Sequence, residues 1–444
     1  IIYSSLKVES MHKVLFSLLL FLIGCSAQNK SIYQPDISGQ NFESQDTQKI
    51  RSLPSASNDR FKRIDKTINA EIEAGKIPGV VALVSINGER VYHKSFGFAD
   101  IEEKKLMKRD SIFRIASMTK AITTVAVMQL YEKGLFQLND PVSNYLTSFK
   151  NPKVLVSVDE NNAVLEIRDA ANEIKIIDLL THSSGLGYPF ISSPLQKIYI
   201  DNGIINGITD KDITLSSQIN KLSELPLLFD PGNRYSYGLN TDVLGHLIEV
   251  LSGQSLNDYF RNEIFLPLEM YDTYFYLPDD KHNRLATLYA YIDKKLISYN
   301  DDSFTDLGNS NYPISGAMAY YSGGAGLSST VSDYSRFLEM LLNYGELNSK
   351  RLLSRKSVEL MISPRMDMNG DGILDFALGF KVIKNIGLLG ELGTPGSYSW
   401  GGAFNTAFWV DPEEKMFGII MSQVRPNRSN INEKFKTMVY QSLK

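Results

Sequence analysis

Strand-like segments lie near both ends of this chain, with helical patterns between them. Residues 80–86 and 90–98 are rich in β-branched and aromatic residues, and the Asn87-Gly88 pair between them is a strong signal for a tight hairpin turn. Similar runs occur near the C-terminus at residues 378–383, 400–412 and 416–423, the last two joined by a Pro-Glu-Glu-Lys turn. Strands contributed by both ends of a chain are typical of one antiparallel sheet covered by helices.

Helical spacing of apolar residues recurs outside these strand-like runs. It is found at residues 60–74, 174–180, 241–253, 333–343 and 435–443. With 444 residues, 43% of them hydrophobic, the chain is long enough for two packed lobes. We therefore expect an α+β fold: an antiparallel β-sheet flanked by helices, with an inserted, mostly helical lobe at roughly residues 140–320. The cleft between two such lobes is the natural place for a site.

The segment FRIASMTK, residues 113–120, carries the first candidate chemistry. It leads into an apolar run that ends at Lys133-Gly134, which predicts a buried helix with Ser117 in its first turn. Three residues span just under one helical turn, so Ser117 and Lys120 share a face. A serine hydroxyl is a weak nucleophile until a base removes its proton, and burial makes an amine a better base. The pair indicates a nucleophile and its base; a capping serine with a surface lysine is the simpler alternative.

The N-terminal region has the pattern of a bacterial lipoprotein signal. A basic start at Met11–Lys13 precedes an apolar stretch over residues 14–23, which is short for a membrane span, and Gly24 leads into Cys25. This pattern predicts lipidation of Cys25, a membrane partner through the lipid anchor, and a location in the bacterial cell envelope. An ordinary secretory signal is the alternative.

Three segments follow from this interpretation. Residues 1–24 would be upstream residues and signal peptide. Residues 25–58 are polar and without pattern, which predicts a flexible tether. Residues 59–444 form the expected folded domain, including the helical lobe.

Charge and cysteine content exclude several classes of protein. A net charge of −4 without a dense basic run argues against a nucleic-acid partner. Cys25 is the only cysteine, so there is neither a disulfide framework nor a cysteine metal site, and we expect no metal and no cofactor. Residues 367–375 alternate Asp and Asn around a glycine as calcium loops do, but Leu378 stands where such a loop needs a carboxylate. A polar hairpin tip is therefore the favoured interpretation.

Several spaced motifs together resemble one family. These are FRIASMTK, IIDLLTHSSGLGY (176–188), YGLNTDVLGHLIEVLSGQSL (237–256), GGAGLSSTVSDYSRFLEMLLN (323–343) and SWGGAFNTAFWVDP (399–412). From about residue 62 to 425 the chain resembles the serine β-lactamase-like superfamily, which comprises class C β-lactamases, low-molecular-mass penicillin-binding proteins and family VIII carboxylesterases. The resemblance implies the fold described above and a serine hydrolase that works through an acyl-enzyme.

The resemblance also implies roles for individual residues. Ser117 would be the acylated nucleophile, Lys120 its base or proton relay, and Tyr237 a second proton shuttle on the leaving-group side. Tyr235 is the rival tyrosine; we prefer Tyr237 because its spacing to Asp242 and Gly245 fits the esterase-like form of the motif. The backbone N–H of Ala403 would be the second oxyanion donor, opposite that of Ser117.

The third family motif departs from the lactamase form. Lactamases carry Lys-Thr-Gly where this chain has Trp400, Gly401 and Gly402, which we expect to line the substrate site. Losing the lysine removes a cation that would meet a substrate carboxylate, at a cost of about 1.5–3 kcal/mol. Leu239 likewise replaces the asparagine that lactamases carry two residues after the motif tyrosine. Both departures favour a neutral, short-chain ester as substrate.

Alternatives remain at the level of function. A basic residue such as Arg234 or Lys381 in place of the missing cation would permit a D-Ala carboxypeptidase or β-lactamase acting on cell-wall peptides or β-lactams. A non-catalytic binding module of the same fold is a third hypothesis. No G-x-S-x-G elbow surrounds Ser117, so we assign His182 to the loop framework and not to a catalytic triad.

Overall fold

The computed structural model of the protein describes residues 58–160, 164–299 and 312–443. The expected signal peptide, Cys25 and all but the last residue of the tether lie outside these ranges. Within them, no helix combines the length and the apolar character that a membrane crossing requires.

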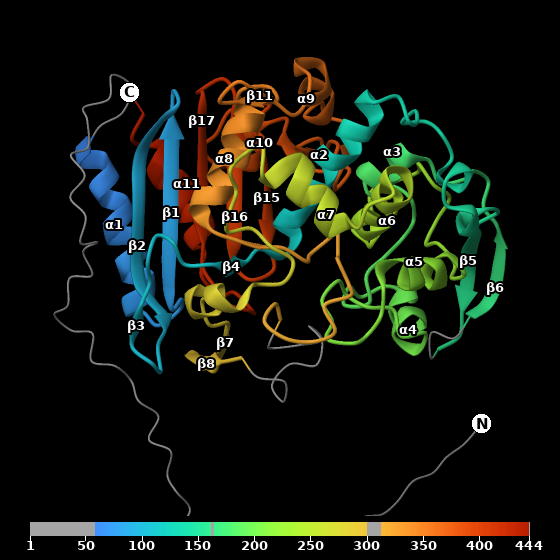
Figure 1. The fold of residues 1–444 in the computed structure, drawn as a ribbon, viewed down its shortest axis with the longest axis horizontal. Helices are drawn as coiled ribbons and strands as arrows, with labels where there is room; N and C mark the ends of the chain where they lie inside the picture. Colours follow the sequence, from blue (N-terminus) through green and yellow to red (C-terminus); the bar gives the residue numbers. More distant parts are fainter. Residues whose placement is uncertain (1–57, 161–163, 300–311, 444) are drawn as a thin grey trace, which may run out of the picture. The chain divides into compact units, whose positions relative to one another are not determined.

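One nine-stranded antiparallel sheet organises the fold (Figure 1). Its strand order is β12-β13-β14-β15-β16-β17-β1-β2-β3, so strands from the two ends of the chain meet where β17 pairs with β1. The N-terminal strands are β1 (Gly79–Ile86), β2 (Glu89–Asp100) and β3 (Lys105–Leu106). The C-terminal strands are β12 (Met366–Asp367), β13 (Leu374–Phe376), β14 (Lys381–Ile383), β15 (Tyr398–Gly402), β16 (Thr406–Asp411) and β17 (Met416–Met421). The antiparallel sheet predicted from both ends of the sequence is confirmed.

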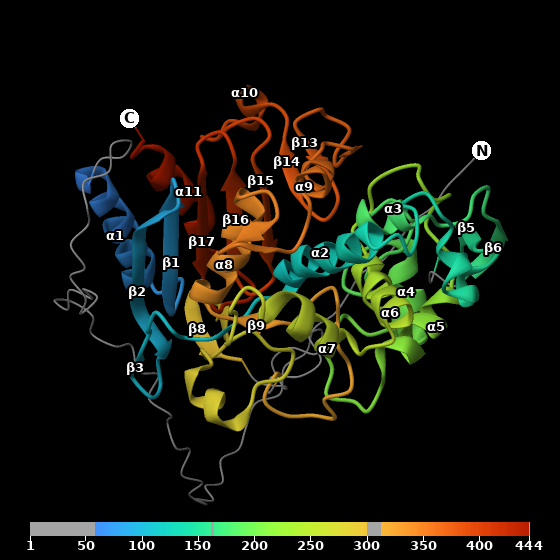
Figure 2. The ribbon, with the colours of Figure 1, turned by 45° about the horizontal axis from the view of Figure 1, so that its top comes forward.

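Helices bury both faces of this sheet (Figures 1 and 2). Helices α1 (Asn58–Glu73) and α11 (Ile431–Tyr440) pack on one face, and α8 (Val331–Leu342) packs on the other. Because successive side chains of a strand point to opposite faces, β1 contributes Val80, Ala82 and Val84 to the α1–α11 core and its alternate residues to the α8 core. All eight residues of β1 are buried, as expected for an interior strand of a sheet that helices cover on both faces.

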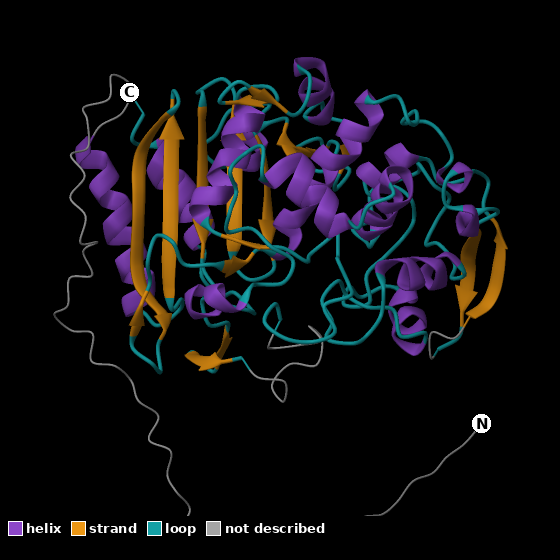
Figure 3. Ribbon diagram, viewed as in Figure 1, coloured by secondary structure: helices purple, strands orange, loops and turns teal. Residues whose placement is uncertain are grey.

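The mostly helical part of the chain lies beside the sheet, and α2 (Thr119–Glu132) extends from the sheet side into this helical part (Figure 3). Its helices are α3 (Ile176–Leu180), α4 (Pro194–Asp201), α5 (Leu215–Ser223), α6 (Asn240–Ser252) and α7 (Leu256–Phe260). It also carries a two-stranded hairpin, β5 (Lys153–Val158) with β6 (Val164–Asp169), which the sequence patterns did not predict. The remaining short elements are β4 (Phe113–Arg114), β7 (Tyr289–Ile292), β8 (Lys295–Ser298), β9 (Ser328–Ser329), β10 (Glu346–Leu347), β11 (Lys350–Arg351), α9 (Arg355–Met361) and α10 (Ile386–Leu389).

The structure corrects the strand expected at residues 400–412. That run contains the end of one strand, a turn and the whole of the next strand, because β15 ends at Gly402 and β16 begins at Thr406. Asn405 closes the turn with a left-handed φ of 67° and an N–H that donates to the Gly402 carbonyl at 3.2 Å. Asparagine tolerates this backbone conformation, but apolar residues on both sides of it concealed the turn in the sequence.

Three further boundaries differ from the sequence predictions. The strand expected at residues 378–383 is confined to β14, because Gly379 adopts a φ of 83° that no regular strand allows. Residues 191–203, where the sequence showed no helical spacing, contain α4, a helix with proline in its first turn and with Leu195, Ile198 and Tyr199 buried. The last helix begins at Ile431, four residues before the predicted start.

The aspartate-rich segment 367–375 forms the polar hairpin tip between β12 and β13. The carboxylate of Asp367 accepts the backbone N–H groups of Asn369, Gly370 and Gly372 at 2.7–3.1 Å. Asp375 lies buried in β13, 3.3 Å from the Lys384 ammonium. The carboxylates thus stabilise the turn and the sheet edge, and they do not converge on one point.

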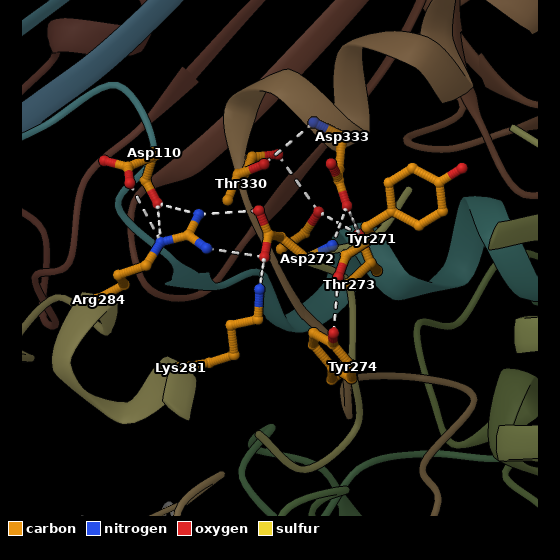
Figure 4. Close-up of polar contacts among 10 residues, drawn as sticks. Asp110, Tyr271, Asp272, Thr273, Tyr274, Lys281, Arg284, Thr330 and Asp333 are labelled. Carbon is orange, nitrogen blue, oxygen red and sulfur yellow. Dashed lines mark hydrogen bonds and ion pairs between the residues drawn. The ribbon is translucent and has the colours of Figure 1, made fainter. Parts of the chain in front are cut away.

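A polar cluster connects the loop after α7 to the start of α8 (Figure 4). Asp333, in the first turn of α8, accepts hydrogen bonds from the Asp272 N–H at 2.7 Å and from the Thr273 hydroxyl at 2.9 Å. The carboxylate of Asp272 in turn pairs with Arg284 at 2.8 Å and with Lys281 at 2.9 Å. Burial raises the pKa of Asp333 to about 6, although these hydrogen bonds oppose the shift.

This pKa predicts that Asp333 changes the stability of the protein with pH. The pKa of this carboxyl group is higher in the folded protein than in the unfolded chain. Its contribution to the free energy of unfolding is therefore fully present below the unfolded pKa of about 4 and is lost as pH rises through the folded pKa of about 6. The Asp333→Asn variant keeps an acceptor oxygen but does not titrate. Its free energy of unfolding, relative to the parent, should therefore rise by about 2 kcal/mol between pH 4.5 and 7.5. Urea unfolding at both pH values measures this; a difference that stays constant with pH would contradict it.

Candidate active site

Ser117 lies on a sharp turn between the sheet side and a buried helix. It belongs to a single 3₁₀ turn, Ala116–Met118, and α2 begins only at Thr119. Ser117 therefore lies in the 3₁₀ turn directly before α2, which corrects the prediction that it occupies the first turn of the α-helix. Ala116 adopts a φ of 42°, an uncommon conformation for a residue other than glycine. This turn leaves the Ser117 side chain half-buried while its neighbours are buried.

Lys120 is enclosed by the protein. All residues from Thr119 to Leu130 are buried, and Lys120 is only 1% exposed. Its Nζ donates to the Gly324 carbonyl at 2.8 Å, to Tyr188 Oη at 3.0 Å and to Ser117 Oγ at 3.4 Å. Three acceptors match the three N–H bonds of an ammonium group, which compensates the cost of burying it. The rings of Tyr188 and Tyr237 also face it, with centroids 5.4 Å and 4.7 Å from Nζ.

The structure brings one of the two candidate tyrosines to the nucleophile. Tyr237 Oη lies 2.7 Å from Ser117 Oγ, within hydrogen-bond distance. Tyr235 instead packs against the rings of His182 and Phe376, at 6.0 Å and 5.3 Å, and burial raises its pKa. Ser117, Lys120 and Tyr237 therefore form one connected group, whereas Tyr235 belongs to the packing behind it.

His182 supports the tyrosine through ring packing and through hydrogen bonds to the loop that follows it. Its ring lies 4.8 Å from that of Tyr237, and its Nδ1 is 3.3 Å from the Gly238 backbone N and 2.9 Å from the Asn240 side-chain amide. Burial, with a further contribution from the Lys120 charge, holds the pKa of His182 well below its usual range. A neutral imidazole in this place orients the loop that carries Tyr237, in agreement with the framework role expected for it.

Strand β15 approaches the nucleophile turn at very close range. A Cβ atom added to Gly402 would come within 2.3 Å of the Ile115 carbonyl oxygen, so only glycine permits the two backbones to lie this close. Thr406 of the paired strand donates its hydroxyl to the same carbonyl at 3.5 Å. Ala403 follows directly and is exposed. The N–H groups of Ser117 and Ala403 thus lie on two segments in mutual contact, and their role as oxyanion donors stays a prediction.

Aromatic side chains surround the third motif. The Trp400 ring lies 5.6 Å from Tyr237 and 5.1 Å from Phe376. Lys381 pairs with Ser399 across β14 and β15, so strand alternation directs it to the sheet face opposite Trp400. Arg234 is exposed and stacks on Phe229, with its guanidinium carbon 4.6 Å from the ring centroid. Neither residue replaces the lysine that lactamases carry here.

The sequence reasoning missed two partners of Lys120. Tyr188 closes the segment IIDLLTHSSGLGY, and its hydroxyl is buried against the ammonium. Burial raises the pKa of Tyr188 well above its usual value, so this phenol stays protonated. The second partner is the carbonyl of Gly324, a backbone group that no residue pattern identifies. The motif that ends at Tyr188 was the only available signal.

Fold and site together define a serine hydrolase of the β-lactamase and penicillin-binding-protein type. A family model described as Beta-lactamase matches residues 64–437, and the chain belongs to that family. It is 29% identical to esterase EstB of Burkholderia gladioli over 79% of this chain and 86% of that protein. It is 28% identical to the lovastatin esterase of Penicillium rubens over 80% and 91% of the two chains.

A solved structure described as EstCE1, a hydrolase with promiscuous acyltransferase activity, superposes with a TM-score of 0.76. The two chains are 26% identical, and the match covers 86% of this chain and 99% of the other. The predictions of the superfamily, the fold and a serine hydrolase are confirmed by these comparisons.

Proposed function

We propose that this protein is a carboxylesterase that hydrolyses short-chain esters through an acyl-enzyme on Ser117. The observation that carries the proposal is the position of Ser117 Oγ, which is 2.7 Å from Tyr237 Oη and 3.4 Å from the buried Lys120 Nζ. A nucleophile within reach of two groups that can exchange protons is the arrangement that acyl transfer requires.

The proposed reaction has two halves. In the first, the Lys120 amine in its neutral form takes the Ser117 proton, directly or through Tyr237 Oη, as Oγ attacks the ester carbonyl, and the carbonyl oxygen becomes negative between the N–H groups of Ser117 and Ala403. The C–O bond to the alcohol then breaks, and Tyr237 passes the proton to the departing oxygen. In the second half, a water molecule gives one proton to the same pair as its oxygen attacks the acyl carbon. The bond between that carbon and Ser117 Oγ then breaks, and the pair returns the proton to Oγ, which releases the carboxylic acid and free Ser117.

The surroundings of the site support an uncharged substrate. The half-buried Trp400 offers an apolar surface next to Tyr237, with the buried Phe376 packed behind it, and Lys381 is directed away from Trp400. A substrate carboxylate placed here would lose its hydration without gaining a cation. Relatives named as esterases agree with this preference.

A substrate panel tests the proposal. The purified domain is incubated with p-nitrophenyl butyrate, a chromogenic cephalosporin and a D-Ala-D-Ala peptide, and initial rates are compared. We expect kcat/KM for the ester to exceed that for either carboxylate-bearing substrate by about ten- to a hundredfold, which corresponds to one lost charge-assisted contact of about 1.5–3 kcal/mol. Higher turnover of the peptide or the cephalosporin would replace the esterase assignment, and inactivity towards all three would favour a binding module.

We also propose that the enzyme acts at the bacterial cell envelope, attached through a lipid on Cys25. The support is the basic start and apolar stretch before Cys25, together with the polar residues 26–57, whose random-coil reach of roughly 30 Å would hold the domain clear of a membrane surface.

A further inference from the structure

A buried hydrogen-bonded chain lies behind Lys120, on the side away from Ser117. Asp242, in the first turn of α6, is 0% exposed, and its Oδ1 accepts the hydroxyl of Ser322 at 2.5 Å. The Ser322 oxygen accepts in turn the backbone N–H of Ala325 at 3.0 Å and that of Gly324 at 3.2 Å. Gly324 is the residue whose carbonyl accepts from Lys120 Nζ at 2.8 Å.

The carboxyl group also touches the backbone of this turn directly. A Cβ atom added to Gly324 would lie 2.4 Å from Asp242 Oδ2 and 3.2 Å from Tyr188 Oη. The Asp242 carboxyl and the Tyr188 hydroxyl therefore both lie against Gly324, the residue whose carbonyl accepts from Lys120. The neighbouring Gly323 carbonyl accepts the hydroxyl of Thr123 on α2 at 2.6 Å, which holds the same turn against the catalytic helix.

We propose that Asp242 is a positioning residue for Lys120, acting through Ser322 and the turn 322–325. The inference rests on the proposed function, because it concerns the lysine that exchanges the proton of Ser117. Lysine has a long, flexible side chain, and its amine serves as a proton acceptor only while a fixed set of acceptors holds it at the nucleophile. Without the Asp242–Ser322 bond, the Gly324 carbonyl loses the contacts that hold it in place.

The role assigned to Asp242 is that of an acceptor, and it does not depend on charge. Burial raises the pKa of Asp242, while the hydrogen bond from Ser322 and the nearby Lys120 charge oppose this effect. The carboxyl oxygen bound by Ser322 remains an acceptor in either protonation state. An amide in the same place should therefore preserve the function, whereas a methyl group should not.

Four variants test the inference with p-nitrophenyl butyrate. Asp242→Ala should lower kcat about a hundredfold with KM within about threefold of the parent, because substrate contacts are intact and only the proton-transfer geometry is lost. Asp242→Asn should recover kcat to within about fivefold of the parent. Ser322→Ala, which removes the link and leaves the carboxyl, should resemble Asp242→Ala.

Asp411 provides the matched control, because its carboxyl is also 0% exposed and accepts hydrogen bonds from Tyr440 at 2.6 Å and from the Glu414 N–H at 3.1 Å. Asp411→Ala should lower Tm and leave kcat of the folded protein within about threefold. Parent-like kcat in folded Asp242→Ala, or equal losses in the Asn and Ala variants, would overturn the inference. If Asp242→Ala does not fold, Ser322→Ala decides in its place. A parent enzyme without esterase activity would instead refute the proposed function, which separates the two failures.

Discussion

The Ser117→Ala variant is expected to lose at least about ten-thousandfold in kcat for p-nitrophenyl butyrate, the typical cost of deleting a catalytic nucleophile. The hydroxyl is the only group of this site that forms the proposed covalent bond, and neither Lys120 nor Tyr237 can act on the ester without it. Ser117 is half-buried, and among the described residues its Oγ forms hydrogen bonds with these two side chains alone, so Tm should change by no more than a few degrees.

Two measurements together check this expectation. Steady-state rates give the loss in kcat, and intact-mass spectrometry of acid-quenched samples should detect the butyryl group on the parent but not on Ser117→Ala. Ser332→Ala serves as the matched control, because Ser332 is also half-buried and lies on α8, away from the Lys120 contacts. A variant that turns over ester at the parent rate would remove Ser117 from the mechanism.

The second large effect is expected at Tyr237. Tyr237→Phe removes the hydroxyl 2.7 Å from Ser117 Oγ and should lower kcat by about a hundred- to a thousandfold, the range typical of a lost general acid or base. The ring is retained, so its packing against Trp400 and His182 should persist and KM should change little.

Tyr235→Phe is the natural comparison for Tyr237→Phe. Both tyrosines lie in the same loop, but Tyr235 contacts His182 and Phe376 with its ring. Its variant should therefore stay within about threefold of the parent in kcat. Equal losses in the two variants would mean that the loop conformation, and not the Tyr237 hydroxyl, is what activity requires.

Much of the fold could be predicted from the sequence because its signals are local. The Asn87-Gly88 turn lies between β1 and β2, whose burial and residue types identify them as strands. The apolar run after Lys120 becomes a helix that is buried from Thr119 to Leu130, as its composition required. Turns concealed within apolar sequence were missed, as at Asn405, because a left-handed residue leaves little trace when its neighbours favour strands.

The sequence predicted a site residue only where its side chain itself is a nucleophile, a base or an acid. Ser117, Lys120 and Tyr237 lie in recognisable motifs, and the structure brings them together. Tyr188 and the Gly324 carbonyl are distant in sequence and meet Lys120 only through packing of the tertiary structure. The role of a backbone carbonyl depends on position alone, so no sequence pattern could have identified it.

The pairing of β17 with β1 has a consequence for the order in which the enzyme folds during its synthesis. The nucleophile helix is translated early, but β1 has no β17 neighbour, and the Ser117 turn has no β15 beside it, until these C-terminal strands have been made. Assembly of the reactive centre is thereby tied to synthesis of β15 to β17. A nascent chain that ends before β15 would hold the serine and lysine without the strand that closes the site beside them.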